Sequence, residues 1–64
     1  MKQIKEYMEI YRNLNNISIR EKIEFKSFYD WMNNEFDLKF IMKQCGFRKE
    51  SDLIRSIEFA CKYF

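Results

Sequence analysis

Twelve of the 64 residues in this chain carry an aromatic ring, namely seven Phe, four Tyr and one Trp. A chain of this length buries only about 60% of the surface that its unfolded form exposes, so it normally needs disulfides, a metal, a partner chain or a strongly aromatic core. Each buried ring removes on the order of 150 to 250 Å² of surface from water. We therefore expect a single small domain, residues 1–64, that depends on its rings for stability.

Residue types that carry catalytic or ligand-binding chemistry are scarce. The chain has no histidine, the commonest general base and metal ligand, and its one glycine, Gly46, is too few for a phosphate-binding loop. The acid pairs Glu6/Glu9 and Glu21/Glu24 alternate with basic residues, in the pattern of a solvated helix face: Lys5, Arg12, Lys22 and Lys26. This composition predicts a protein that is not an enzyme and that has no cofactor, no metal and no small-molecule substrate.

The N-terminal sequence and the cysteines indicate the compartment. No apolar run approaches the roughly 20 residues that span a bilayer, and the first residues lack the apolar stretch of a secretory signal. Cys45 and Cys61 are expected to be free buried thiols, since a disulfide scaffold carries more pairs. We expect a cytoplasmic protein without a membrane partner. The many Lys, Asn, Ile and Phe residues are typical of an AT-rich genome, such as that of a phage or mobile element.

Helical spacing of apolar residues and the absence of proline predict an all-α fold, a compact bundle of about four short helices. The first helix is expected from Lys2 to about Asn15, where an asparagine-rich turn follows. The second is expected from about Ile19 to Met32, because Ser18 and Glu21 have the spacing of a capping box. An alternative interpretation places short strands at residues 17–19 and 23–25, although no glycine turn joins them.

Local signals also delimit the two remaining helices. Residues 33–36 interrupt the helical pattern, and Asp37 is a suitable N-cap for a short helix that ends at Cys45. Gly46 is expected to stop this helix in a left-handed conformation, with Phe47 folding back. The last helix follows residues 48–50, capped by Ser51 or a neighbour. Side chains at the inward positions are Ile4, Tyr7, Met8, Tyr11, Leu14, Ile19, Ile23, Phe25, Phe28, Tyr29, Met32, Leu38, Ile41, Met42, Cys45, Leu53, Ile54, Ile57, Ala60, Cys61 and Phe64.

The last two helices and their glycine turn form a helix-turn-helix-like pair at the C-terminal end of the chain. Positions that match the second helix-turn-helix of AraC-type transcription regulators are Ile41, Cys45, Gly46, Phe47, Ser51 and Arg55, with Leu53 and Ile57 as apolar substitutes. Residues 37–57 thus resemble that motif. The resemblance implies a small DNA-binding transcription regulator whose last helix enters the major groove of duplex DNA. It places on the DNA Lys39, Lys43, Arg48, Lys49, Arg55, Ser56 and Lys62. The alternative for Arg55 is an ion pair with Asp52 or Glu58.

The rings point to another function, because they are more than so small a core can enclose and several of them lie off the inward positions. Exposed apolar patches rimmed by charge mark partner surfaces, and Trp and Tyr are common interface anchors. We favour a small non-enzymatic protein-interaction module or inhibitor, with DNA binding as the alternative. Its partner is then another protein, either a host protein or a second copy in a homodimer. The candidate interface residues are Trp31, Phe36, Phe40, Phe59 and Tyr63.

Overall fold

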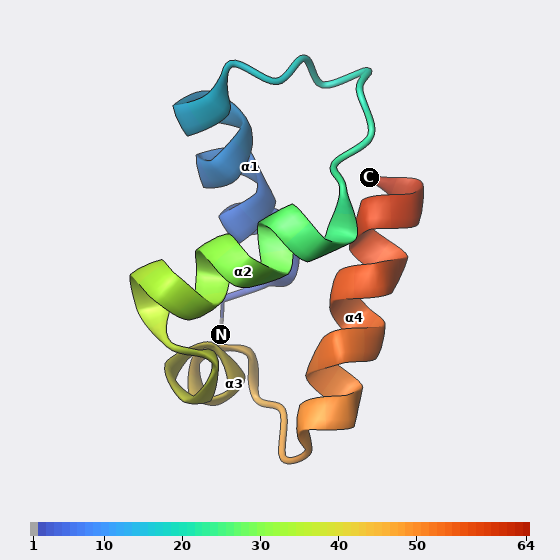
Figure 1. Cartoon of the computed structure of the whole chain (residues 1–64). Coiled ribbons are helices and arrows are strands. Elements are labelled where there is room, and N and C mark those ends of the chain that lie inside the picture. Colours follow the sequence, from blue (N-terminus) through green and yellow to red (C-terminus); the bar gives the residue numbers. More distant parts are fainter. Residues whose placement is uncertain (1) are drawn as a thin grey trace.

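Four α-helices account for most of residues 2–64, the part of the chain that this computed structural model describes (Figure 1). They are α1 (Ile4–Asn15), α2 (Phe25–Phe36), α3 (Leu38–Cys45) and α4 (Glu50–Tyr63). The all-α prediction is confirmed, and the alternative strands at residues 17–19 and 23–25 do not form. α2 lies at the centre of the arrangement, packed against α1, α3 and α4, while α1 also packs against α4.

α1 ends at Asn15 as predicted, but it begins at Ile4, two residues after its predicted start. Ile4, Tyr7 and Met8 are buried, and Asn16 stops the helix in the left-handed region with φ 54°. Asparagine tolerates this conformation, as the predicted turn requires. Leu14, however, is 66% exposed, and its prediction as a core residue is wrong. The last turn of α1 projects beyond α2 in Figure 1. A residue on the apolar side of this turn therefore has no helix opposite it to pack against.

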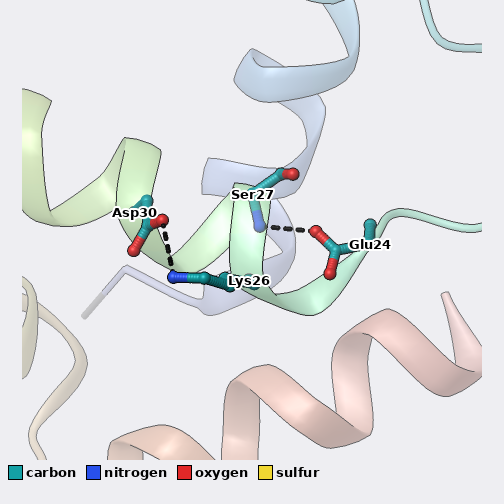
Figure 2. A network of polar contacts seen from close by, with 4 residues as sticks. All are labelled: Glu24, Lys26, Ser27 and Asp30. Atoms are coloured by element: carbon teal, nitrogen blue, oxygen red, sulfur yellow. Dashed lines mark hydrogen bonds and ion pairs between the residues drawn. The ribbon is translucent and has the colours of Figure 1, made fainter.

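The start of α2 is the largest departure from the predicted boundaries. The helix begins at Phe25, and its N-cap is Glu24, whose carboxylate accepts a 2.7 Å hydrogen bond from the Ser27 N–H (Figure 2). Ser18 instead forms a local turn, because its hydroxyl accepts from the Arg20 N–H at 3.2 Å. Such side-chain turns compete with helix capping at serine. Ile19 therefore lies in a loop and is 82% exposed, contrary to its predicted burial.

α2 also continues through residues 33–36, where a break was predicted. The Phe36 ring lies against Tyr7 and Trp31, with centroid distances of 5.2 and 5.4 Å. Ring pairs of this kind contribute about 0.5 to 1.5 kcal/mol beyond their area burial, which offsets the weak helix propensity of asparagine. Asp37 then ends α2 and caps α3, since its carboxylate accepts from the Lys39 N–H at 3.3 Å. The prediction of Asp37 as an N-cap is confirmed.

The turn between α3 and α4 has the predicted conformation at Gly46. Gly46 has φ 81°, and the N–H groups of Gly46 and Phe47 both donate to the Met42 carbonyl. This is the expected glycine stop, and Phe47 is half-buried against the core. Ser51 does not cap α4. The N-cap position falls on Lys49, whose side chain makes no capping hydrogen bond.

The core combines aliphatic residues with a continuous group of rings. The buried hydrophobic side chains come from all four helices and from the loop before α2: Ile4, Tyr7, Met8, Ile23, Phe28, Met32, Ile41, Leu53, Ile57, Ala60 and Cys61. The inner ring cluster consists of Tyr7, Tyr11, Phe28, Trp31 and Phe36, whose centroids lie 5.2 to 6.0 Å from their neighbours. Both cysteines are free thiols, as predicted; Cys61 is buried as expected, whereas Cys45 is only partly buried.

Arg12 is buried, although its spacing had placed it on a solvated face. Its guanidinium donates to the Ser18 carbonyl in the loop and, at 3.1 Å, to the main-chain oxygen of Phe64. Figure 1 shows why this is possible, because the loop between α1 and α2 runs beside the C-terminal end of α4. The long arginine side chain reaches across this junction, and its hydrogen bonds compensate for its removal from water.

Candidate protein-interaction surface

The aromatic residues fall into two populations, one in the core and one on the surface. Apart from the inner ring cluster, four rings remain between 47% and 59% exposed: Phe40, Phe59, Tyr63 and Phe64. Three of them, Phe59, Tyr63 and Phe64, lie together at the C-terminal end of α4 and are called here the outer ring group. Phe40 stands apart from them on α3.

The outer ring group holds itself together through ring contacts. The centroids of Phe59 and Tyr63, one helical turn apart, are separated by 4.6 Å, and those of Phe59 and Phe64 by 6.0 Å. Two lysines cover the outer rings, since Lys5 Nζ lies 5.4 Å from the Phe64 centroid and Lys62 Nζ 5.5 Å from that of Tyr63. The rings therefore have defined positions before any partner is present, which reduces the entropy lost on binding.

A hollow lies on each side of Phe64. The first, of about 290 Å³, lies between the start of α1, the end of α3 and the side of α4 that carries Phe59 and Ala60. The second, of about 260 Å³, lies between α1 and the loop before α2, and Ile19 and Tyr63 are among its walls. Lys5 and Phe64 line both hollows, so the two are adjacent and are separated by one aromatic side chain.

Basic groups outnumber acidic ones around the outer ring group. Lys2, Lys5 and Arg12 line the hollows together with a single acid, Glu9, and the Lys62 ammonium lies over Tyr63. Glu6 lies near the first hollow, since its charge helps to raise the pKa of the Cys45 thiol. The surface thus combines exposed apolar rings with a positive surround.

The predicted interface residues do not form one patch. Phe59 and Tyr63 are exposed and in contact, and Phe40 is exposed on another helix. Trp31 and Phe36 are half-buried in the inner ring cluster, so only part of each ring is available to a partner. Phe64 and Ile19, which were predicted as core residues, are instead exposed at this surface. Helical spacing gave no signal for the exposure of Phe64, because Phe64 continues the apolar face of Ile57 and Cys61 at i+7 and i+3.

The residues that the helix-turn-helix resemblance assigned to DNA contact are mostly exposed. Ser56 is half-buried and lines the first hollow, while the others are exposed side chains of α3, α4 and their connection: Lys39, Lys43, Arg48, Lys49, Arg55 and Lys62. Arg55 lies 3.9 Å from the Asp52 carboxylate, which corresponds to the ion pair considered for it. α3 packs mainly on α2, whereas α4 packs mainly on α1 and α2.

The two cysteine thiols are held in their neutral forms. Burial, and then the charge of Glu6, raises the pKa of the Cys45 thiol, while burial followed by the charge of Glu24 raises that of Cys61. Both thiols are thus protonated and weakly nucleophilic at neutral pH. Within residues 2–64, no group of three or more Cys, Asp or Glu side chains is arranged to hold a metal ion. None of the helices in this range has the length and apolar character of a membrane span.

Comparisons of the chain with protein-family models, with curated proteins and with solved structures give no match.

Proposed function

We propose that this protein is a non-enzymatic protein-interaction module that binds its partner through the outer ring group. The observation that carries the proposal is the contact of Phe59 with both Tyr63 and Phe64 while all three rings remain about half exposed. Exposed apolar patches rimmed by charge mark interaction sites. Aromatic residues in such patches commonly supply most of the binding free energy. A module of this kind acts by contact, including as an inhibitor that covers a site on a larger protein.

The test is capture of a partner that depends on this surface. The wild-type chain and the Phe59→Ala variant are each immobilised and exposed to lysate of the organism that encodes the chain. The proposal predicts a protein that the wild type retains and Phe59→Ala loses. Phe40→Ala is the matched control, because it removes a ring of similar exposure from α3 (47% against 55% for Phe59). Loss of capture by both variants, or by neither, would contradict the assignment of binding to the outer ring group.

Duplex DNA binding by α3 and α4 is the second candidate function. It is supported by the left-handed stop at Gly46 and by the exposed basic side chains of Arg48 and Lys49 in the turn that follows. The acids Glu50 and Asp52 at the start of α4 oppose it, because they would face the phosphates.

Titration with mixed-sequence duplex DNA tests this function. A DNA-binding regulator should bind at low salt and weaken steeply as salt rises, because each phosphate contact releases counterions. Arg55→Ala should then reduce binding without changing the melting temperature, because the Arg55 side chain is exposed. Absence of binding at about 50 mM salt, where phosphate contacts are strong, would exclude the regulator.

A further inference from the structure

We propose that the outer ring group and its two hollows bind an acidic, amphipathic segment of the partner protein, with one apolar side chain in each hollow. This inference rests on the proposed function and specifies the chemistry of the partner.

The size of the hollows favours side chains as their occupants. At about 290 and 260 Å³ they lie at or below the lower end of small-molecule sites, which measure about 300 to 1,000 Å³. They are adjacent, because Phe64 and Lys5 form a wall of each. Side chains three or four residues apart on a helix lie about 5 to 6 Å from one another. A helical segment can therefore place consecutive apolar side chains on the two sides of Phe64, as in other helix-in-groove complexes.

The charge of the surround selects an acidic partner. The basic groups are Lys2, Lys5, Arg12 and Lys62, against the acids Glu9 and Glu6. Complementary charge steers association and suppresses partners of the same sign. A second copy of this chain, placed symmetrically on the same face, would bring two positive surrounds together. The charge thus favours a different, acidic protein over a homodimer.

The ring contacts favour a peptide over single-stranded nucleic acid, which would be attracted by the same lysines. Nucleic acid binds such surfaces by stacking bases on open ring faces. Here Lys5 lies over Phe64 and Lys62 over Tyr63, while Phe59 is in contact with both neighbouring rings. The exposed edges of these rings and the two hollows beside Phe64 therefore remain available to bind apolar side chains.

The experiment is selection from a phage-displayed library of random peptides about 14 residues long, roughly four helical turns. The bait is the wild-type chain, and synthetic copies of the enriched peptides are then titrated by fluorescence anisotropy. Enriched peptides should be acidic, with apolar residues three or four positions apart. Phe64→Ala should weaken their binding about tenfold or more, as expected of a central anchor. Lys5→Glu should weaken it about three- to tenfold.

Lys39→Glu is the matched control for Lys5→Glu, because it changes the net charge equally at an exposed position of α3. It should weaken binding less than Lys5→Glu does. Melting temperatures of all variants, measured by circular dichroism, separate loss of binding from loss of folding. If Phe64→Ala is not folded, Tyr63→Ala replaces it, since Tyr63 is the most exposed ring of the group.

The outcomes distinguish this inference from the proposed function. Enriched peptides that depend on Phe64 but lack acidic residues, or that bind Lys5→Glu equally well, would overturn the acidic partner and leave the interaction module in place. Peptides insensitive to every substitution in the outer ring group would contradict both. Binding of an oligothymidine or of phosphatidylserine vesicles with the same dependence on Phe64 and Lys5, and no enriched acidic peptide, would also overturn the inference in favour of those ligands.

Discussion

The buried guanidinium of Arg12 ties together three parts of the chain. The Arg12 side chain extends from α1. Its guanidinium donates one hydrogen bond to a carbonyl in the loop before α2 and another to the main-chain oxygen of Phe64, which follows α4. The loop has no regular secondary structure of its own, so such contacts determine where it lies. Arg12 also lines the second hollow, and it therefore connects the stability of the fold with the shape of the candidate surface.

We predict that Arg12→Ala lowers the free energy of unfolding by about 2 to 3 kcal/mol, because hydrogen bonds from a charged group contribute about 1.5 to 3 kcal/mol. Urea denaturation followed by circular dichroism measures the change. Arg55→Ala, which removes an exposed arginine, serves as the control and should remain close to wild type. Equal stability of the two variants would show that the Arg12 contacts contribute nothing to the fold.

A substitution at Tyr7 should raise the free energy of unfolding, whereas Arg12→Ala should lower it. The Tyr7 ring is fully buried and its hydroxyl has no hydrogen-bond partner within the described residues. An unsatisfied buried hydroxyl costs about 1 to 3 kcal/mol, so Tyr7→Phe should raise the free energy of unfolding by about 1 kcal/mol. The comparison is Tyr29→Phe, which removes a hydroxyl that donates to Glu50 at 3.3 Å and should not stabilise the protein. A less stable Tyr7→Phe would indicate that an ordered water serves the hydroxyl.

The helices differ in how their ends are determined. α3 has a carboxylate cap at Asp37 and a glycine stop at Gly46, both of which depend on neighbouring residues and are visible in the sequence. α2 begins at a glutamate cap and continues to Phe36 because of ring contacts with other parts of the chain. The predicted boundaries were correct at Asp37 and Gly46, and wrong at the start of α2, where Ser18 and Glu24 offer competing local hydrogen bonds, and at its end, where packing extends the helix.

The Glu24 cap makes the stability of α2 depend on pH. The hydrogen bond from Ser27 to its carboxylate lowers the pKa of Glu24 below its usual value of about 4.3. Stability from this bond is therefore present above that usual value and is lost as the pH falls through the lowered pKa. We predict that Glu24→Gln has a lower melting temperature than wild type at neutral pH, and that the difference disappears in acid.

Melting curves recorded by circular dichroism across this pH range measure the effect. Glu21→Gln is the matched control, because Glu21 is an exposed acid in the loop before α2 and its carboxylate forms no hydrogen bond within residues 2–64. A difference between Glu24→Gln and wild type that persists unchanged in acid would rule out the ionised cap as its source.

In the whole molecule, the rings serve two purposes in two different places. Between α1 and α2 they form the inner ring cluster, which supplies much of the core of so short a chain. At the C-terminal end of α4 the outer ring group remains exposed. Exposed rings promote association with a partner, but like charges around them oppose association between copies.

We predict that the isolated protein is monomeric in light scattering at high micromolar concentration and low salt, because a symmetric contact through the outer ring group would bring like charges together. Lys5→Glu, which weakens the positive surround, should associate more readily than wild type at the same concentration. A wild-type dimer that is lost in Phe59→Ala would contradict this prediction and assign the outer ring group to self-association.

The sequence alone determined that this chain forms helices, that Asp37 and Gly46 delimit α3, and that the chain has more rings than so small a core can enclose. These properties depend on residue type and on spacing within a turn or two of helix. Tertiary structure decided that Arg12 is buried, that Ile19 and Leu14 are exposed, and that the surplus rings gather as Phe59, Tyr63 and Phe64. Burial depends on which distant segment lies opposite a side chain, and the path of the loop before α2 brings those segments together.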